Sequence, residues 1–303
     1  MAPSASKRTT VEIGSRRLSV SNLDKVLYPE AGFTKAQVID YYVRVAPVML
    51  THVAGRGVTL RRWPDGVGGE SFFEKRCPKH RPEWVDTALG PGDRGGAIGY
   101  CCLDEVAALA WSANLAALEI HAPMARAVDI ETPTMVVFDL DPGEPASIIE
   151  CCRVALDIRE VLEHLGLVAF PKTSGSKGLQ LYVPINTPLT HEHASSFALA
   201  VAQLLEKQQP DHVVSNMTKA LRPGKVFVDW SQNSRHKTTV APYSLRAKAA
   251  PTVSTPVTWG EVSDAADGTP LSFESHEVLE RVEQMGDLFA ETATVEQELP
   301  NPR

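Results

Sequence analysis

The feature that most constrains this chain is a run of apolar and β-branched residues at 134–140 (TMVVFDL) that leads directly into Asp141, Pro142 and Gly143. Such a run predicts a buried central strand. Asp139 and Asp141 lie two positions apart, so on a strand both carboxylates project from the same face where the chain turns away. Adjacent carboxylates repel each other, and a divalent cation removes that conflict. The alternative is that the motif only forms a turn and caps a helix.

A third acidic residue, Asp229, lies in the alternating segment 225–230 (KVFVDW). It falls on the face opposite Val226 and Val228, where an unpaired carboxylate in an apolar strand would be costly. Three carboxylates on neighbouring strands predict a two-ion site for in-line phosphoryl chemistry. The alternative is an ion pair with a nearby base.

The surrounding pattern predicts one α+β catalytic unit over residues 1–303, with tails at about 1–18 and about 289–303. A capping box from Thr34 predicts a helix over 34–49. Asp104 is expected to cap an Ala-rich helix to about residue 116, and a short strand follows at 118–121. Further helices are expected at about 145–165, at about 190–207 and in the acidic C-terminal region, and strands at 167–170 and 179–185.

The loop 174–178 (SGSKG) joins two predicted strands and suggests a phosphate-binding nest. Its small residues let backbone amides converge on an anion, with Lys177 as a point charge. It is not a P-loop, and a flexible hairpin is the alternative. The G-x-G-x-x-G match at 90–95 is interpreted as a turn because no helix pattern follows it.

Basic residues gather locally although the chain carries 30 Lys+Arg against 37 Asp+Glu. Residues 259–303 hold 11 of the acids and 2 of the bases, so the first 258 residues have a net charge of +2. Phe72 and Phe73 lie in a basic stretch with Lys75, a combination that can stack bases and hold a backbone, or that is simply core with a solvated flank. Six bases and one acid between 222 and 248 add a second basic region.

No apolar run reaches the roughly 20 residues of a membrane span, and no signal peptide pattern is present. The five cysteines are an odd number and include two adjacent pairs, which suggests free thiols and a reducing cytoplasm. Cys77 and His80 have metal-ligand spacing that Cys101 or Cys102 could complete, although a zinc site lacks a second well-spaced pair.

Together these motifs resemble the primase-polymerase domain of bacterial DNA ligase D, within the archaeo-eukaryotic primase superfamily. The resemblance runs from VSNLDKVLYP at residue 20 through FFEK, DLDPG, TSGSKG, KVFVDWSQN and TTVAPYSLR to about residue 288. It implies an α+β primase-polymerase fold, with central mixed and antiparallel sheets that carry the acidic triad and helices that flank them.

The resemblance implies a template-dependent polymerase that serves end joining and favours ribonucleotides. Asp139, Asp141 and Asp229 would hold two Mg²⁺ or Mn²⁺ ions. The nucleoside triphosphate would be bound by Ser174, Lys177, Gln180, His121, Gln232 and Arg246. DNA with a 5′-phosphorylated gap or end would be bound by Asn22, Lys25, Lys35, Arg61, Phe72, Phe73, Lys75 and Arg222.

One position departs from the family pattern S-G-S-K-G-x-H, because Gln180 replaces the histidine. Glutamine donates a hydrogen bond but carries no charge, so weaker binding of the triphosphate is expected. No K-x-D-G ligase signature occurs, which suggests a stand-alone polymerase that works with a separate ATP-dependent ligase and a Ku-type partner. Two other functions fit the same residues: a metal-dependent nuclease or phosphohydrolase, and a DNA-end or gap-binding module without turnover.

Overall fold

A five-stranded sheet is built around β12, the strand that carries Asp139 and Asp141. The computed structural model describes residues 8–92 and 95–300, and in it the strand order is β13-β14-β12-β16-β15. β12 pairs antiparallel with β14 and β16, whereas β15 and β16 run parallel. The strands are β12 Met135–Pro142, β13 Phe170–Thr173, β14 Leu179–Pro184, β15 Val213–Val214 and β16 Val226–Asp229.

Three α-helices pack against one face of this sheet. Val136, Phe138 and Leu140 alternate along β12 and are buried in one core with α3 Ile148–His164, α4 His191–Gln208 and α5 Trp259–Ala266. Because successive strand residues point to opposite faces, Asp139 and Asp141 project from the other face. The binary pattern of β12 therefore fixes the direction in which its carboxylates point.

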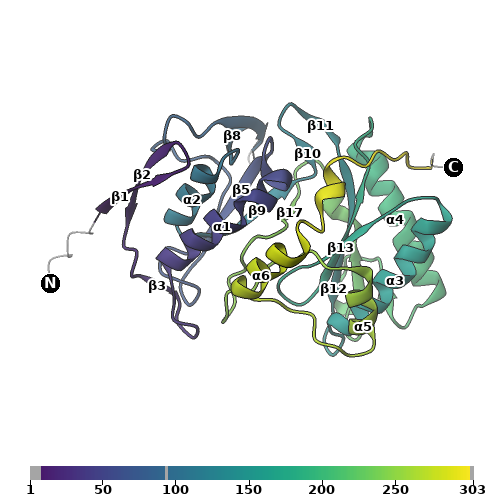
Figure 1. Ribbon diagram of the computed structural model, residues 1–303. Helices are drawn as coiled ribbons and strands as arrows, with labels where there is room; N and C mark the ends of the chain where they lie inside the picture. Colours follow the sequence, from purple (N-terminus) through teal and green to yellow (C-terminus); the bar gives the residue numbers. More distant parts are fainter. Residues whose placement is uncertain (1–7, 93–94, 301–303) are drawn as a thin grey trace.

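A second sheet, of six strands, forms the other lobe (Figure 1). Its order is β17-β9-β5-β8-β7, with β6 beside β5. Leu118 and Ile120 of β9 pack in the core that includes α1 Lys35–Val53 and α2 Val106–Asn114, so Glu119 and His121 point the opposite way. The strands are β5 Gly57–Arg62, β6 Phe72–Glu74, β7 Thr87–Pro91, β8 Ala97–Cys102, β9 Ala117–Pro123 and β17 Thr238–Val240.

Smaller elements complete the chain. Three two-stranded hairpins, the helix α6 and three short 3₁₀ helices surround the two sheets. Their bounds are β1 Arg8–Ile13, β2 Arg16–Ser21, β3 Val26–Tyr28, β4 Phe33–Thr34, β10 Ala125–Arg126, β11 Asp129–Pro133, α6 Ser275–Met285, η1 Lys219–Leu221, η2 Trp230–Asn233 and η3 Ala290–Ala293. Both expected tails carry structure, since β1 falls within the first and η3 within the second, while residues 1–7 and 301–303 lie outside the described residues.

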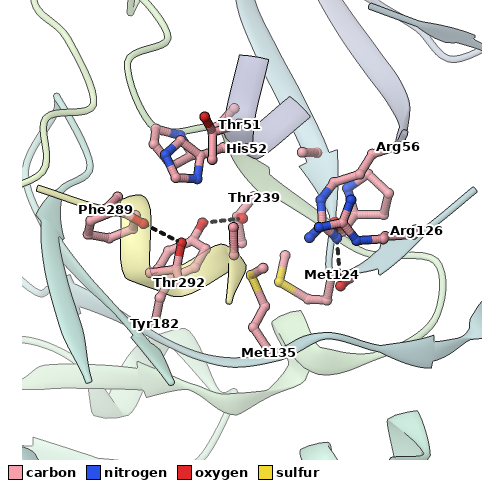
Figure 2. A pocket seen from close by; sticks show the side chains of 15 residues that line it. Thr51, His52, Arg56, Met124, Arg126, Met135, Tyr182, Thr239, Phe289 and Thr292 are labelled. Atoms are coloured by element: carbon pink, nitrogen blue, oxygen red, sulfur yellow. Dashed lines mark hydrogen bonds between the residues drawn. The ribbon is translucent and has the colours of Figure 1, made fainter. Parts of the chain in front are cut away.

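The two lobes meet along β14 and β17. The hydroxyls of Tyr182 and Thr239 are hydrogen-bonded at 2.7 Å, and the buried Arg56 side chain donates to the carbonyl of Met124 at 2.8 Å (Figure 2). The same guanidinium also donates to the Thr134 hydroxyl at 2.8 Å. A cavity of about 20 Å³ beside these contacts has room for little more than one water. The junction between the lobes is therefore tightly packed and polar.

The structure confirms the α+β class and corrects several predicted boundaries. β13 begins at Phe170 rather than at residue 167, because its partners on β14 start opposite Phe170 and continue to Thr173. α2 begins at Val106 with Glu105 as N-cap, whereas Asp104 accepts a hydrogen bond from the amide of Gly55 at 2.7 Å. The turn predicted over 90–95 is confirmed in part: residues 90 and 91 end β7, the amide of Gly95 donates to the carbonyl of Gly92 at 3.2 Å, and residues 93 and 94 lie outside the described residues.

The cysteine prediction is wrong at one pair. Cys77 and Cys101 form a disulfide, whereas Cys102, Cys151 and Cys152 are buried free thiols. The pairing joins the segment after β6 to β8, which sequence spacing alone does not reveal. Cys77 and Cys101 are two of the four residues considered for a zinc site, and the disulfide joins them to each other instead. Within residues 8–92 and 95–300, no helix is long and apolar enough to cross a membrane.

Candidate active site

The three predicted catalytic carboxylates converge on the face of the five-stranded sheet opposite α3, α4 and α5. In the antiparallel register of β12 and β16, Asp139 lies directly opposite Asp229, and Asp141 follows two residues along the same face. Burial and the charge of Asp141 raise the pKa of Asp139 to about 7. Burial and Asp229 likewise raise the pKa of Asp141. The site thus concentrates negative charge that lacks a full complement of positive partners.

Amide and hydroxyl donors hold two of these carboxylates in place. Gln180 Nε2 donates to Asp139 Oδ1 at 2.9 Å. Asp229 caps η2, with Oδ1 accepting from the Ser231 amide and hydroxyl at 3.0 and 2.6 Å and Oδ2 accepting from Gln232 Nε2 at 3.0 Å. Each carboxylate is therefore oriented before any ligand binds.

This donor set suits a hard divalent cation. Mg²⁺ and Mn²⁺ prefer carboxylate oxygens, and a cation would relieve the repulsion that raises the pKa values of Asp139 and Asp141. In the part of the chain that the structure describes, no three His, Cys, Asp or Glu side chains already converge as a closed metal site. The oxygens of Asp139 and Asp229 are instead turned toward the donors of Gln180, Ser231 and Gln232.

A cavity of about 430 Å³ opens beside Asp139 and Asp141, though not beside Asp229, and is lined by all six residues of the predicted nucleotide site. It lies between the lobes, because β9 and β17 contribute one wall and β12 and β14 the other. The predicted residues that line it are Asp139, Asp141, His121, Ser174, Lys177, Gln180, Arg222, Gln232 and Arg246. Lys248 also lines it and was not among the predicted site residues.

The loop 174–178 is packed tightly against the end of β12, and glycine is required there. Gly175 has φ of +66°, and a Cβ on Gly178 would lie 2.1 Å from the carbonyl oxygen of Leu140. Ser174 Oγ accepts from the amides of Ser176 and Gly178 at 3.3 and 3.1 Å. The backbone therefore approaches the carboxylates closely, as a phosphate-binding loop must.

Gln180 is buried and uses both ends of its amide. Besides its bond to Asp139, its Oε1 accepts from Lys172 Nζ at 2.5 Å, and Lys172 donates in turn to Ser254 Oγ at 2.6 Å. Lys172 is fully buried, and burial holds its pKa well below the ordinary value. Sequence reasoning missed this lysine because it lies in an expected loop that is in fact the end of β13.

The predicted cations at the cavity mouth have protein partners. Lys177 Nζ lies 2.5 Å from Glu144 Oε1 in an exposed pair. Arg246 Nε donates to Glu119 Oε1 at 3.0 Å, and its Nη1 donates to the carbonyl of Ser174. The guanidinium of Arg222 lies over the ring of Phe227, 3.7 Å from its centroid.

Except for Arg222, which lines the cavity beside Asp141, the predicted DNA-binding residues lie on the six-stranded lobe and the hairpins beside it. Phe72 and Phe73 of β6 are 44% and 54% exposed, and Lys75 follows them. Lys35 donates to the carbonyl of Ser21 at 2.7 Å, and burial together with Lys25 and Arg62 lowers its pKa to about 8. Arg62 was not among the predicted DNA-binding residues. Its position directly after Arg61 is the sequence signal that could have identified it.

Two further predicted DNA-binding residues have defined geometry. Asn22 adopts a left-handed backbone with φ of +54° at the end of β2. Lys25 forms an exposed ion pair with Asp65 at 2.8 Å. Arg62 likewise pairs with Glu74 at 2.9 Å, whereas Lys35 donates to a backbone carbonyl. A phosphate beside Lys35 would favour its charged form, so this corner of the molecule is suited to a phosphate.

Comparison with known proteins agrees with this geometry. The family model for the primase-polymerase domain of LigD matches residues 34–289. The multifunctional non-homologous end joining protein LigD of Mycobacterium bovis is 48% identical over 282 residues, and that of Mycolicibacterium smegmatis is 46% identical over 276 residues. Each alignment covers 90% of this chain and 37% or 36% of the relative, so the chain spans a little over a third of their length.

A solved structure extends the agreement to the fold. The polymerase domain of Mycobacterium tuberculosis ligase D in complex with DNA superposes with a TM-score of 0.86 at 45% identity, covering 93% of this chain and 99% of that one. These matches place the chain in a class of nucleotidyltransferases, the primase-polymerases. The chain belongs to the LigD primase-polymerase family.

Proposed function

We propose that this protein adds nucleotides, ribonucleotides in preference, to a 3′ end at short 5′-phosphorylated gaps or broken ends during DNA repair by end joining. The observation that carries the proposal is one cavity that joins Asp139 and Asp141 to His121, Lys177 and Arg246. The carboxylates of Asp139 and Asp141 suit metal ions, and the side chains of Lys177 and Arg246 suit the phosphates of a nucleoside triphosphate. The family membership supports the same chemistry.

In this proposal the carboxylates of Asp139, Asp141 and Asp229 hold two Mg²⁺ or Mn²⁺ ions. When bound, such ions stabilise the charge that develops at the α-phosphate as the 3′-hydroxyl attacks. The protein's own contribution is positioning: Gln180, Ser231 and Gln232 orient the carboxylates, and the loop 174–178 with Arg246 holds the triphosphate.

The DNA would lie along the six-stranded lobe. Lys25, Lys35 and Asn22 would bind the 5′-phosphate beyond the gap, Phe72 and Phe73 would stack on the template, and Arg222 would meet the primer or template terminus. The proposed partners are a Ku-type end-binding protein and a separate ATP-dependent ligase, and the proposed location is the cytoplasm. The superposed polymerase domain of Mycobacterium tuberculosis ligase D is in complex with DNA, which supports a DNA site on this chain as well.

A single assay separates the three functions that fit the site. Labelled gapped DNA is incubated with the protein, Mn²⁺ and either nucleoside triphosphates or none. A polymerase extends the primer only with nucleotides, a nuclease shortens it in both, and a binding module changes only its mobility. We expect extension.

The control for this assay is the carboxylate triad. Asp139→Ala, Asp141→Ala and Asp229→Ala should each reduce extension to below about 1% of wild type, since loss of a two-metal ligand removes several kcal/mol of transition-state stabilisation. Gel-shift affinity for gapped DNA should persist because other residues hold the DNA. Extension above a few per cent in any of these variants would contradict the assignment.

A further inference from the structure

A carboxylate outside the metal triad connects the two halves of the proposed site. Glu119 of β9 is 2% exposed. Its Oε2 lies 3.0 Å from His121 Nε2 and 3.6 Å from an Arg61 terminal nitrogen. Its Oε1 accepts from Arg246 Nε at 3.0 Å. One buried side chain therefore contacts groups that belong to two different ligand sites.

Strand register explains how Glu119 reaches the DNA-facing side. On β5, Arg61 lies opposite Glu119 of β9 on one side and opposite Phe73 of β6 on the other. The Arg61 guanidinium lies 4.9 Å from the centroid of the Phe73 ring. Phe73 also contacts His121 edge-to-face, with ring centroids 5.7 Å apart. Glu119, Arg61 and Phe73 therefore form a continuous row of side-chain contacts across β9, β5 and β6.

The other end of the row reaches the nucleotide cavity. Arg246 donates to the carbonyl of Ser174 in the phosphate loop as well as to Glu119. The backbone amide of Ala247 donates to Glu119 Oε1 at 3.2 Å, which fixes the segment that carries Arg246. Both His121 and Arg246 line the cavity with Asp139. Any shift of Glu119 is therefore transmitted to both His121 and Arg246.

The charge of Glu119 is what holds this arrangement. Burial alone would raise its pKa, but the hydrogen bonds and charges of His121 and Arg246 outweigh burial and lower the pKa to about 2. The carboxylate is accordingly ionised at every physiological pH. Without it, Arg61 and Arg246 would be two guanidiniums without their shared counter-ion.

We propose that Glu119 is a positioning residue that couples template binding at Phe73 to nucleotide binding at His121 and Arg246. The inference rests on the proposed function. A base stacked on Phe73 restrains Arg61 and His121, and Glu119 passes that restraint to Arg246. Gapped DNA then tightens nucleotide binding and, by linkage, nucleotide tightens DNA binding by the same factor.

The test compares nucleotide affinity with and without DNA. The dissociation constant of a fluorescent nucleoside triphosphate is measured for wild type and for Glu119→Gln, alone and with saturating gapped DNA that offers one template base. We expect DNA to tighten binding about fivefold or more in wild type, a coupling at the low end of the usual range. In Glu119→Gln the ratio should fall to within about twofold of one.

Two variants make this result specific. Phe73→Ala should lose the same coupling, and the double variant should lose no more, because both residues belong to one connection. Glu261→Gln removes a carboxylate that pairs with Arg281 at 2.6 Å on the other lobe, and its coupling ratio should match wild type. Should Glu119→Gln fail to fold, Arg61→Met breaks the same row at a partly exposed position.

The outcomes separate this inference from the proposed function. If wild type extends gapped DNA but Glu119→Gln and Arg61→Met keep the wild-type coupling ratio, the coupling role of Glu119 is refuted while the polymerase function stands. If Glu119 had only a structural role, its replacement would raise both dissociation constants and leave their ratio unchanged. That result would also refute the coupling role. If wild type binds nucleotide with DNA-dependent affinity but does not extend, the proposed function fails and the ratio still decides the role of Glu119.

Discussion

At the scale of single residues, Gln180 contacts the proposed metal site through Asp139. Its amide donates to Asp139 and accepts from the buried Lys172, so it has little remaining capacity for a triphosphate. The bond from Gln180 lowers the pKa of Asp139, opposing the effects of burial and of Asp141. Replacing the amide with an apolar side chain should therefore let protons compete better with the metal.

We accordingly predict that Gln180→Leu raises the Mn²⁺ concentration needed for half-maximal extension, and raises it more at pH 6 than at pH 8. The variant should also lose about 1–3 kcal/mol of unfolding free energy, since Lys172 loses a buried acceptor. Metal titrations at both pH values and urea unfolding test this. An unchanged metal requirement with a raised nucleotide KM would mean that Gln180 instead contacts the triphosphate, as the family resemblance first suggested.

A second residue-scale prediction concerns Lys35. Burial together with Lys25 and Arg62 lowers its pKa to about 8, so the free side chain loses its charge as the pH rises through that value. A bound 5′-phosphate favours the charged form, and affinity for it should decline above pH 8. We expect the affinity ratio of 5′-phosphate to 5′-hydroxyl gaps to be tenfold or more at pH 7, from two charge-assisted contacts of ~1.5–3 kcal/mol each, and smaller at pH 9.

Variants of Lys35 and Lys25 supply the controls. Lys35→Arg keeps its charge at pH 9, so its preference for a 5′-phosphate should not fall with pH. Lys35→Ala and Lys25→Ala should each remove most of the preference, and added salt should weaken it in wild type. Equal affinity of wild type for both ends at pH 7 would contradict a phosphate site at this corner.

At the scale of elements, the disulfide fixes the segment that follows the exposed aromatic strand β6. Cys77 and Cys101 are 24 residues apart in sequence, and β8, which contains Cys101, pairs with β5. Closing a loop of that length restricts the unfolded chain, which corresponds to about 3–4 kcal/mol in the chain-entropy description. The other three cysteines are buried thiols, so a reductant has a single structural target.

We therefore predict that dithiothreitol lowers the melting temperature of wild type by several degrees. A loss of a few kcal/mol in a chain of this size corresponds to roughly 2–4 °C for each kcal/mol. Cys77→Ser should melt at the temperature of the reduced protein and show no response to dithiothreitol. If wild type melts at the same temperature with and without reductant, the bridge does not stabilise the folded protein.

At the scale of the whole molecule, sequence alone predicted the faces of strands better than the contacts between them. The strand predicted at 134–140, with Asp139 and Asp141 two positions apart, and the alternation along 225–230 placed the three carboxylates on one face, because side-chain direction on a strand follows from position. The meeting of β9 with the carboxylate sheet could not be predicted, since it depends on how two lobes pack. For that reason the contact of Glu119 with Arg246 gave no sequence signal, whereas Lys172 was missed because it lies in a segment that was expected to be a loop.

The lobes are joined by the C-terminal segment after α6, which lies between them (Figure 1). Asp287 Oδ2 lies 2.9 Å from Nε2 of His52 on α1, and its Oδ1 accepts from the Tyr243 hydroxyl at 2.6 Å. Phe289, two residues later, packs edge-to-face against Tyr182 of the other lobe (Figure 2). Asp287 therefore anchors a segment that touches both sheets, and its loss should weaken the whole fold.

Asp287→Asn should accordingly lower the unfolding free energy by about 1–3 kcal/mol at pH 6, and the deficit should disappear in acid. Burial would raise the pKa of Asp287, but His52 and Tyr243 outweigh it and hold the pKa below its ordinary value. A carboxyl with a lowered folded-state pKa stabilises fully above the unfolded value, about 3.9, and loses that contribution as the pH falls through the folded value. Urea unfolding at pH 6 and pH 3 measures this, with Asp40→Asn, at an exposed position on the same helix as His52, as the matched control. A deficit of equal size at both pH values would show that Asp287 stabilises the junction by packing rather than by its charge.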